Sequence, residues 1–437
     1  MPTLSVSVVG GGLAGLCSAI SLRRAGHQVT IYEKSQFKRE IGAAITLTPN
    51  ANRVLEHWRL DLRTLGETDK LQSRRVNPET LACEARVDLS GVPRTFGANF
   101  NAFHRVDLHK GLREMAEQLG IKIHLGQEIV GLDCETATIT TATGDVVQTD
   151  LVILGDGINC KFLEALNGSP VPNSISSKSV YRTLIPMSRL MSNPRIASLF
   201  KGEPSGFLNS FNPETGVMLI TYPCRSDTIL NIVLFHNTRP KYADADHWNH
   251  PSTIEDAVHE MQKGNTHPVW SELMECADEM KVYRLSSRQP LETMVRGKCV
   301  IIGDAAHPMM ATYAQAGCMA IEDAAALEVL FANPKGPVED TLKLFNAMRL
   351  PRNAVTQIMS NAMFYHTALD AQQAIKKFYT GNLLPAQIEP WTEPIQRFFY
   401  AYNVFEQAEK IKTYWEREGK VPPRELLEED MFGLHSE

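Results

Sequence analysis

A glycine-rich turn near the N-terminus constrains the fold of this chain more than any other feature. The run Leu4 to Val9, which precedes the turn, is rich in β-branched residues and is typical of a buried parallel strand. After the turn, apolar residues recur at helical spacing from Leu13 to Leu22, and Gly26 ends the helix. The order strand, glycine turn, helix predicts the first βαβ unit of a Rossmann-like α/β fold.

The turn itself reads Gly10-Gly11-Gly12-Leu13-Ala14-Gly15, which fits the G-x-G-x-x-G pattern of dinucleotide-binding folds. In this pattern Gly10 makes the tight turn, Gly12 lets the backbone approach a pyrophosphate, and Gly15 lets helix and strand pack closely. The N–H groups at the helix start attract the anion. Glu33 closes the second strand about 20 residues further on, where an acid that binds ribose hydroxyls is expected. We therefore predict a bound dinucleotide.

The composition excludes several classes of protein. With 437 residues, 43% hydrophobic and 22% charged, the chain is long enough for two or three domains and can bury a core. Its 44 basic and 50 acidic residues give a net charge of −6, whereas nucleic-acid binders carry a basic footprint. No apolar run reaches the roughly 18 residues of a membrane span. The eight cysteines lack CxxC or zinc spacing, so we expect reduced thiols, no metal site and a cytoplasmic location.

Changes of pattern along the chain predict a discontinuous α/β domain with a sheet inserted into it. Between about Pro170 and Arg284, turn residues separate strand-like runs and few helices intervene, which favours a mostly antiparallel sheet. Beyond Val338 the periodicity is helical. We predict three parts: a dinucleotide-binding domain of residues 1–75, 98–170 and 285–355, a substrate-binding β-sheet domain of residues 76–97 and 171–284, and a helical C-terminal region of residues 356–437.

A second motif follows the apolar run that ends at Ile302. It reads Gly303-Asp304-Ala305-Ala306-His307-Pro308, and Gln315-Ala316-Gly317-Cys318 then leads into a helix. A carboxylate at a strand end, such as Asp304, can accept hydrogen bonds from a ribityl chain, although by itself a helix cap explains it better. Amides at Gly317 and Cys318 can point at a flavin pyrimidine edge. Together these segments resemble the flavin-binding segment of class A FAD-dependent aromatic monooxygenases, the salicylate and para-hydroxybenzoate hydroxylase type.

Three further stretches match this family in chain order. Residues 40–45, Glu-Ile-Gly-Ala-Ala-Ile, which include Ala44, are similar to its loop beside the isoalloxazine, and Pro49-Asn50-Ala51 follows as in the family. The segment His104-Arg105-Val106-Asp107-Leu108 resembles one whose arginine contacts the FAD. Tyr222-Pro223-Cys224-Arg225, with Leu230-Asn231-Ile232-Val233 after it, resembles a hairpin of the salicylate hydroxylase branch.

The resemblance implies both a fold and a chemistry. It implies a Rossmann-like, GR2-type FAD-binding domain with the inserted sheet, bound FAD, and NAD(P)H and O₂ as co-substrates. The expected reaction is hydroxylation, or oxidative dearomatisation as in fungal secondary metabolism, of a phenolic or similarly electron-rich ring through a flavin C4a-hydroperoxide. The partner is then a small aromatic molecule, and the chain is a monomer or a homodimer. Epoxidation or rearrangement of an indole or terpenoid, and a non-catalytic FAD-binding protein, are the alternatives.

Three side chains of the inserted sheet are candidates for contact with a substrate: Arg182, Tyr222 and His236. Because the hydroperoxide is an electrophile, a cation or base that favours a phenolate would promote attack. Strand alternation gives each candidate apolar neighbours on its own face: Val180 and Leu184 for Arg182, Met218 and Ile220 for Tyr222, and Leu230, Ile232 and Leu234 for His236. Arg182 is the strongest candidate, since a cation on an apolar face needs an anionic partner. Structural hydrogen bonding explains Tyr222 equally well and His236 better.

Overall fold

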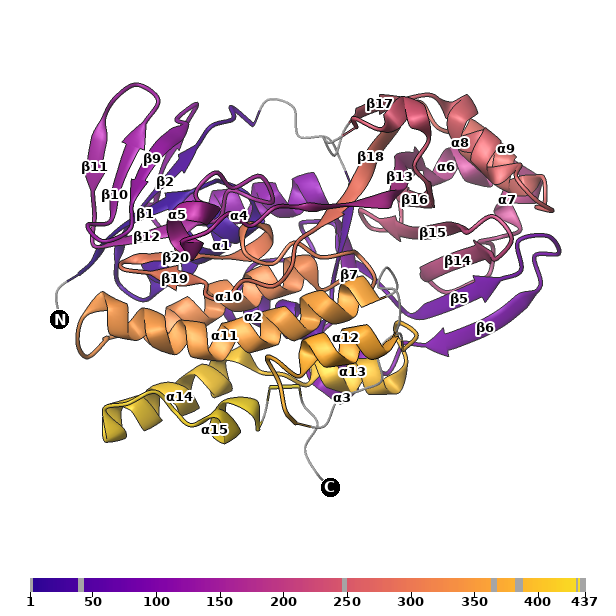
Figure 1. Ribbon diagram of the computed structural model, residues 1–437. Coiled ribbons are helices and arrows are strands. Elements are labelled where there is room, and N and C mark those ends of the chain that lie inside the picture. The colour runs from indigo at the N-terminus through magenta and orange to yellow at the C-terminus, as the bar shows by residue number, and fades with distance from the viewer. Residues whose placement is uncertain are drawn as a thin grey trace.

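The apolar runs at the N-terminus and in the middle of the chain form one six-stranded sheet (Figure 1). The computed structural model describes residues 3–37, 43–245, 250–362, 368–381, 388–429 and 431–432. The sheet is parallel except for β19, which runs antiparallel at one edge. In spatial order its strands are β19 (Val295–Arg296), β20 (Cys299–Ile301), β12 (Leu151–Leu154), β1 (Ser5–Val9), β2 (Gln28–Glu33) and β8 (Lys122–Leu125).

Helices cover this sheet as expected of a Rossmann-like domain. The first helix, α1 (Leu13–Arg24), follows the glycine turn and packs along α10 (Ala316–Phe331), while α4 (Arg105–Gln118) packs beside α1. The four apolar residues of β12 are fully buried, because a parallel strand is covered on both faces. The α/β fold predicted from the sequence is confirmed.

A second sheet of eight strands forms the right-hand half of the molecule in Figure 1. Its pairs are antiparallel except for β14 with β5, so the predicted antiparallel character is confirmed. In spatial order its strands are β17 (His250–Ser252), β18 (Met280–Ser287), β13 (Ser174–Pro186), β16 (Ile229–Asn237), β15 (Val217–Cys224), β14 (Gly206–Asn212), β5 (Gln72–Val76) and β6 (Cys83–Asp88).

The first strand of this sheet begins earlier than the sequence pattern indicated. We assigned residues 72–75 to the dinucleotide-binding part, whereas the structure pairs them with Gly206 to Asn209 of β14. The run Gln72-Ser73-Arg74-Arg75 has no apolar alternation, so nothing in its local pattern marks it as a strand.

The two faces of the eight-stranded sheet have different neighbours. Leu219, Leu234 and Tyr181 point to the outer face and are buried in one apolar cluster with Trp270, which belongs to α9 (Val269–Glu275). The helix α8 (Ile254–Met261) completes this cover. The alternate residues of these strands point to the inner face, which is turned toward the six-stranded domain. Helices α8 and α9 do not cover this face, so it can form part of a binding site.

Two small three-stranded sheets complete the strand structure. One is β3 (Ala44–Leu47), β7 (Asn101–His104) and β4 (Thr68–Asp69), and it contacts the eight-stranded sheet, since Ala44 N donates to Asn231 Oδ1 at 3.3 Å. The other consists of β9 (Ile129–Asp133), β10 (Thr138–Thr141) and β11 (Val146–Gln148).

The C-terminal region is helical and packs internally. Phe398, Phe399 and Tyr400 are fully buried in one cluster with Phe100 and Phe207, so this aromatic segment closes the core rather than facing outward. Its helices, low in Figure 1, are α11 (Val338–Asn361), α12 (Ala368–Ile375), α13 (Glu393–Tyr400), α14 (Val404–Glu418) and α15 (Arg424–Glu428). The remaining helices are α2 (Pro49–His57), α3 (Val92–Phe96), α5 (Leu163–Asn167), α6 (Met187–Met191), α7 (Pro194–Ala197), η1 (Pro240–Tyr242) and η2 (Gly303–Ala305).

A cluster of fully buried charges links α10 to α11. Arg349 donates to Glu322 Oε2 at 2.7 Å and to Asp323 Oδ1 at 2.8 Å, and Arg352 donates to both oxygens of Glu322 at 2.7 and 2.8 Å. His307 Nε2 lies 2.7 Å from Asp323 Oδ2. The carboxylates of Glu322 and Asp323 are therefore fixed by these side chains, and His307 and Arg349 lower the pKa of Asp323 to about 2 against the effect of burial.

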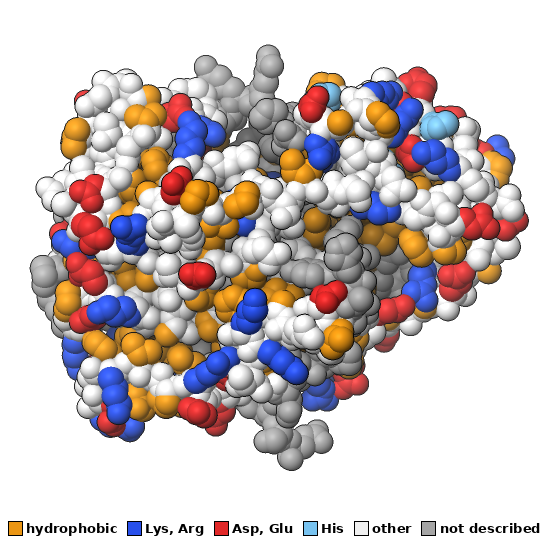
Figure 2. All heavy atoms as spheres, in the orientation of Figure 1, with side chains coloured by type: hydrophobic (Ala, Val, Ile, Leu, Met, Phe, Trp, Pro, Cys, Tyr) orange, Lys and Arg blue, Asp and Glu red, His pale blue; other side chains and the backbone are white. Residues whose placement is uncertain are grey.

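Lys, Arg, Asp and Glu side chains are interspersed over the face of the molecule shown in Figure 2. The eight cysteines are free thiols, and six of them are buried. In the part of the chain that the structure describes, none of the helices combines the length and the apolar character needed to cross a bilayer.

Candidate active site

The glycine turn has a geometry that excludes a side chain at two positions. Gly10 has a φ of +99°, and a Cβ built there would lie 2.6 Å from the carbonyl oxygen of Gly155. A Cβ at Gly15 would lie 1.9 Å from the carbonyl oxygen of Gly10. The helix α1 approaches the sheet this closely only because both residues lack a side chain. At Gly12, by contrast, a Cβ would meet open space.

The beginning of α10 lies opposite the glycine turn. Its helical hydrogen bonds begin with Met319 N, which donates to Gln315 O at 2.7 Å, so the amides of residues 316–318 come before the first of them. Ala314, just before the helix, has a left-handed φ of 56°. This conformation costs a residue with a side chain about 1–3 kcal/mol, so the surrounding structure must hold it in place.

One cavity of about 920 Å³ joins these segments to the eight-stranded sheet. At one end it is lined by Gly12, Gly317 and the exposed side chain of Asp304, which follows β20. Arg105, the first residue of α4, and Ala44 of β3 also line it. The predicted cofactor residues Gly12, Ala44, Arg105, Asp304 and Gly317 therefore surround one space, although they come from distant parts of the chain.

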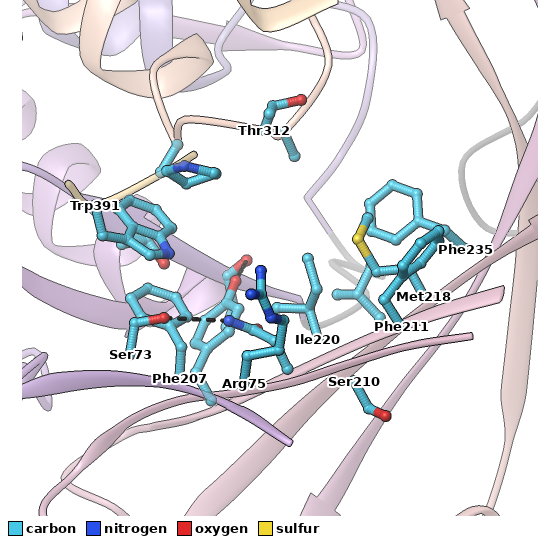
Figure 3. Close-up of a pocket in the computed structure, with 18 of the residues that line it drawn as sticks. Ser73, Arg75, Phe207, Ser210, Phe211, Met218, Ile220, Phe235, Thr312 and Trp391 are labelled. Carbon is cyan, nitrogen blue, oxygen red and sulfur yellow. Dashed lines mark hydrogen bonds between the residues drawn. The ribbon is translucent and has the colours of Figure 1, made fainter. Parts of the chain in front are cut away.

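The floor of the cavity at its other end is the inner face of the eight-stranded sheet. Val233, Ile220, Asn209, Arg75 and Ala85 are successive register partners on five adjacent strands. Register partners share a face of a sheet, and all five line the cavity. A second row runs beside the first and consists of Phe235, Met218 and Phe211 (Figure 3).

The opposite wall comes from segments outside the sheet. Trp391 and Thr312 face Ile220 and Met218 across the cavity in Figure 3. The indole of Trp391 is stacked on Phe207, with ring centroids 4.7 Å apart and an interplanar angle of 10°. Our reading of the sequence missed Trp391 because the C-terminal region carries no recognisable motif, and its contact with β14 exists only in the folded chain.

Tyr222 stands where the sheet meets the cofactor end of the cavity. Its side chain lines the cavity, packs edge-on against Phe207 with centroids 5.2 Å apart, and donates from Oη to Ala44 O at 3.4 Å. Burial raises the pKa of this phenol, so it keeps its proton near neutral pH. The O–H group is therefore held at the junction between β15 and β3.

Arg182 stands in the same row as Val233 and Ile220 but beside the lining residues rather than among them. Its guanidinium carbon lies 5.4 Å from the centroid of the Tyr283 ring, a cation–π geometry. Burial lowers the pKa of Arg182 from its usual range, yet a guanidinium stays protonated in proteins. The cavity therefore has a cation at its edge, next to an apolar floor.

The match to a protein family agrees with this arrangement. Residues 3–357 match the model of a family described as FAD binding domain. The FAD-dependent monooxygenase cfoG of Aspergillus candidus is 31% identical over 427 residues, which cover 94% of this chain and 96% of that protein. The chain belongs to the FAD-dependent monooxygenases. The resemblance seen in the sequence motifs is confirmed.

Two further comparisons extend this finding. The 3-hydroxybenzoate 6-hydroxylase 1 of Aquipseudomonas alcaligenes is 26% identical over 402 residues, which cover 89% of this monooxygenase and 96% of that protein. The crystal structure of CtdE in complex with FAD and a substrate superposes with a TM-score of 0.79 at 21% identity, covering 96% of this chain and 100% of that chain. At this identity the superposition establishes the shared fold.

The residues of this monooxygenase fit the FAD that the family binds. Glycine is required at Gly10 and Gly15, and open space lies beside Gly12, where a pyrophosphate is expected. The cavity runs on from there past Asp304 to the start of α10. A carboxylate for the ribityl chain and helix-start amides for the ring therefore lie along one path.

Two other predicted cofactor residues of this monooxygenase are already engaged. Glu33 accepts from Gly11 N at 2.6 Å and from Ser35 N at 2.7 Å, so its carboxylate holds the glycine turn. The Cys318 side chain points away from the cavity, where Sγ lies 3.3 Å from Thr48 Oγ1, and only its amide stays a candidate donor. Residues 40–42 of the loop beside the isoalloxazine lie outside the described residues.

His236 lies on the other face of the sheet. Its ring is stacked on Tyr181 with centroids 4.2 Å apart and an interplanar angle of 8°, and Nδ1 lies 2.8 Å from Asn237 O. Leu230, Ile232 and Leu234 share that face, which α8 and α9 cover. The neighbours of His236 are as apolar as those of Tyr222, but they belong to the core and not to the cavity. We therefore leave His236 out of the proposed substrate contacts.

The burial of His236 leads to a pH prediction. Burial lowers its pKa to about 4, below the value of about 6.5 for a free histidine. Between these pH values the unfolded chain binds a proton that the folded chain does not, so the free energy of unfolding falls as the pH drops. We expect His236→Gln to remove up to about 3 kcal/mol of this pH dependence. Urea unfolding at pH 7.5 and 4.5 measures it.

The same variant separates a structural role from a catalytic one. We expect His236→Gln to leave the pH profile of turnover unchanged, because the imidazole does not reach the cavity. A shift of that profile would contradict the placement of His236 on the outer face.

Proposed function

We propose that this protein uses NAD(P)H and O₂ to hydroxylate the ring of a phenol or a similarly electron-rich aromatic molecule, which binds between FAD and the inner face of the eight-stranded sheet. One observation carries the proposal. A single cavity connects the glycine turn and the start of α10 to a largely apolar floor, with Tyr222 lining the junction and Arg182 next to Val233 of the floor. A ring on that floor would lie against the cofactor.

The chain's own groups have distinct tasks in this proposal. The apolar floor and Trp391 hold the ring and exclude water from the reacting faces. Arg182 places positive charge next to a site of low dielectric constant, where it favours the phenolate over the neutral phenol and so raises the electron density of the ring. Tyr222, whose O–H donates to Ala44 O, is held in place and limits the position of the ring by contact with its edge.

Bound FAD supplies the reductive activation of O₂ that no side chain can provide. The residues that would hold it are those along the path from Gly10 to Gly317, with Arg105 and Asp304 beside it. The similarity to 3-hydroxybenzoate 6-hydroxylase 1, which is 26% identical, supports an aromatic substrate. We take NADH or NADPH as the reductant of the FAD, because monooxygenases of this class use a reduced nicotinamide.

Turnover with labelled oxygen tests the proposed function. The FAD-loaded protein is incubated with a panel of phenols, NADH or NADPH, and ¹⁸O₂. We expect phenol-stimulated consumption of the pyridine nucleotide and a product that carries one ¹⁸O atom on its ring. An epoxide or a rearranged ring in the product would indicate epoxidation or oxidative rearrangement instead of hydroxylation. Oxidation of the nucleotide that no aromatic molecule stimulates would contradict the proposal.

Replacing Arg182 tests the role of the cation. We expect Arg182→Met to keep FAD bound but to lower the rate of hydroxylation at least about 100-fold, since the phenolate loses its electrostatic partner. Arg284→Met, which removes a guanidinium from the neighbouring strand β18, serves as the control and should stay within about threefold of wild type. Wild-type turnover of Arg182→Met would remove Arg182 from the mechanism.

A further inference from the structure

The cavity continues well beyond the place where a single ring would meet the flavin. Its floor row runs from Val233 through Ile220, Asn209 and Arg75 to Ala85, on five adjacent strands. Neighbouring strands lie about 4.8 Å apart, so this row is about 19 Å long. A single benzene ring against the cofactor would leave most of the floor uncovered.

The part of the cavity furthest from the glycine turn, which we call the distal arm, is built differently from the centre. Its residues come from β5, β6 and β14, from the turns that follow β5 and β14, and from the segment before α13. They are Arg75, Asn77, Pro78, Glu79, Glu84, Ala85, Asn209, Asn212, Pro213, Glu214 and Glu389. Polar groups therefore replace the apolar residues that line the centre.

The charges of the distal arm are predominantly negative. It has four carboxylates, on Glu79, Glu84, Glu214 and Glu389, against the single guanidinium of Arg75. Arg75 is engaged with two of them, because its nitrogens lie 2.7 Å from Glu389 Oε1 and 3.7 Å from Glu84 Oε2. Within the described residues no ion pair involves Glu79 or Glu214. A carboxylate on a ligand would be repelled here, and an ammonium would be attracted.

A hydrogen bond between two strands fixes the floor of the arm. Asn209 of β14 donates from Nδ2 to Ser73 Oγ of β5 at 3.2 Å, the dashed line in Figure 3. The Oδ1 of Asn209 is buried and is not accessible from the cavity. The electrostatic preference of the arm therefore comes from its carboxylates.

We propose that the substrate is an elongated molecule of at least two rings, whose end remote from the flavin carries a basic nitrogen and no carboxylate. This inference rests on the proposed function, because one ring must reach the cofactor. The second ring covers the floor between Ile220 and Ala85. The nitrogen lies in the distal arm, where the carboxylates of Glu79 and Glu214 attract it.

Four probes that differ in ring number and charge test this inference. They are 4-hydroxybenzylamine, 4-hydroxybenzoate and the two corresponding 4′-hydroxybiphenyls, one with an aminomethyl group and one with a carboxylate. The dissociation constant of each is measured by perturbation of the flavin absorbance of the holoenzyme. We expect the two-ring amine to bind best, about tenfold more tightly than the one-ring amine and about tenfold more tightly than the two-ring acid.

Variants of the distal arm connect these preferences to named residues. We expect Ala85→Phe, which blocks the far end of the floor, to weaken both two-ring probes at least fivefold and to leave the one-ring probes unchanged. Glu79→Gln combined with Glu214→Gln should reduce the preference for amine over acid to about twofold, since the charge is removed without a change of shape. Glu275→Gln, on the exposed side of α9, should change neither.

The outcomes separate this inference from the proposed function. Equal or tighter binding of the one-ring acid, together with its hydroxylation, would contradict the elongated substrate but not the proposed hydroxylase function. Unchanged selectivity in the double glutamine variant would overturn the role of the distal arm. Failure of all four phenols to perturb the flavin would overturn both.

Discussion

Gly15→Ala is expected to yield a protein that has lost its FAD. The added methyl group would stand 1.9 Å from the carbonyl oxygen of Gly10, a distance at which the backbone must move. Because the obstacle is main chain on both sides, α1 has to withdraw from the turn, and overpacking of this kind costs about 1–3 kcal/mol or more. The cradle for the pyrophosphate opens at the same time, so we expect FAD affinity to fall at least about 100-fold. The flavin released per mole of purified protein measures it.

Gly91→Ala is the matched control for this substitution. A Cβ at Gly91 would meet nothing within 4 Å, and its φ of −80° suits alanine. This variant should therefore carry a full complement of FAD. A Gly15→Ala protein that is as yellow as wild type would refute the assignment of the turn.

The largest effect on stability is expected from Arg349→Met. This change leaves Glu322 and Asp323 fully buried with fewer cations around them, since Arg349 contacts both at 2.7–2.8 Å. Removal of one partner of a buried ion pair typically costs about 3–5 kcal/mol, because the remaining charge is not solvated. The free energy of unfolding in urea, measured with saturating FAD, should fall by that amount.

Arg397→Met gives the contrasting case of an exposed pair. Arg397 contacts Glu393 at 2.9 Å on the surface of α13, where both side chains are more than half exposed. Such pairs contribute about 0.5 kcal/mol or less. If Arg349→Met costs as little as Arg397→Met, the buried cluster does not hold α10 and α11 together as inferred.

The features that could be predicted from the sequence are those that depend on residues close together along the chain. The glycine turn, the strand before it and the helix after it are recognisable because each depends on residues within a few positions of one another. The segment around Asp304 and the start of α10 is local in the same sense. We propose that these elements position the cofactor, and the structure forms each of them where the sequence pattern predicted it.

The substrate half of the cavity was harder to predict because strand alternation assigns residues to a face without saying what covers that face. Tyr222 and His236 had equally apolar neighbours, yet Tyr222 lines the cavity and His236 lies beneath α8 and α9. A sheet buried on both sides is apolar on both sides. Arg75 and Trp391 were missed because only folding brings Arg75 to the floor and Trp391 to the opposite wall of one cavity.

The central claim is that cofactor and substrate share one cavity, and a spectral titration tests it most directly. The purified protein, loaded with FAD, is titrated with the uncharged two-ring phenol 4-phenylphenol while the visible absorbance of the flavin is recorded. We predict a saturable change of the flavin band, because the phenol binds against the isoalloxazine. Binding of the phenol, detected by calorimetry, that leaves the flavin band unaltered would contradict the account.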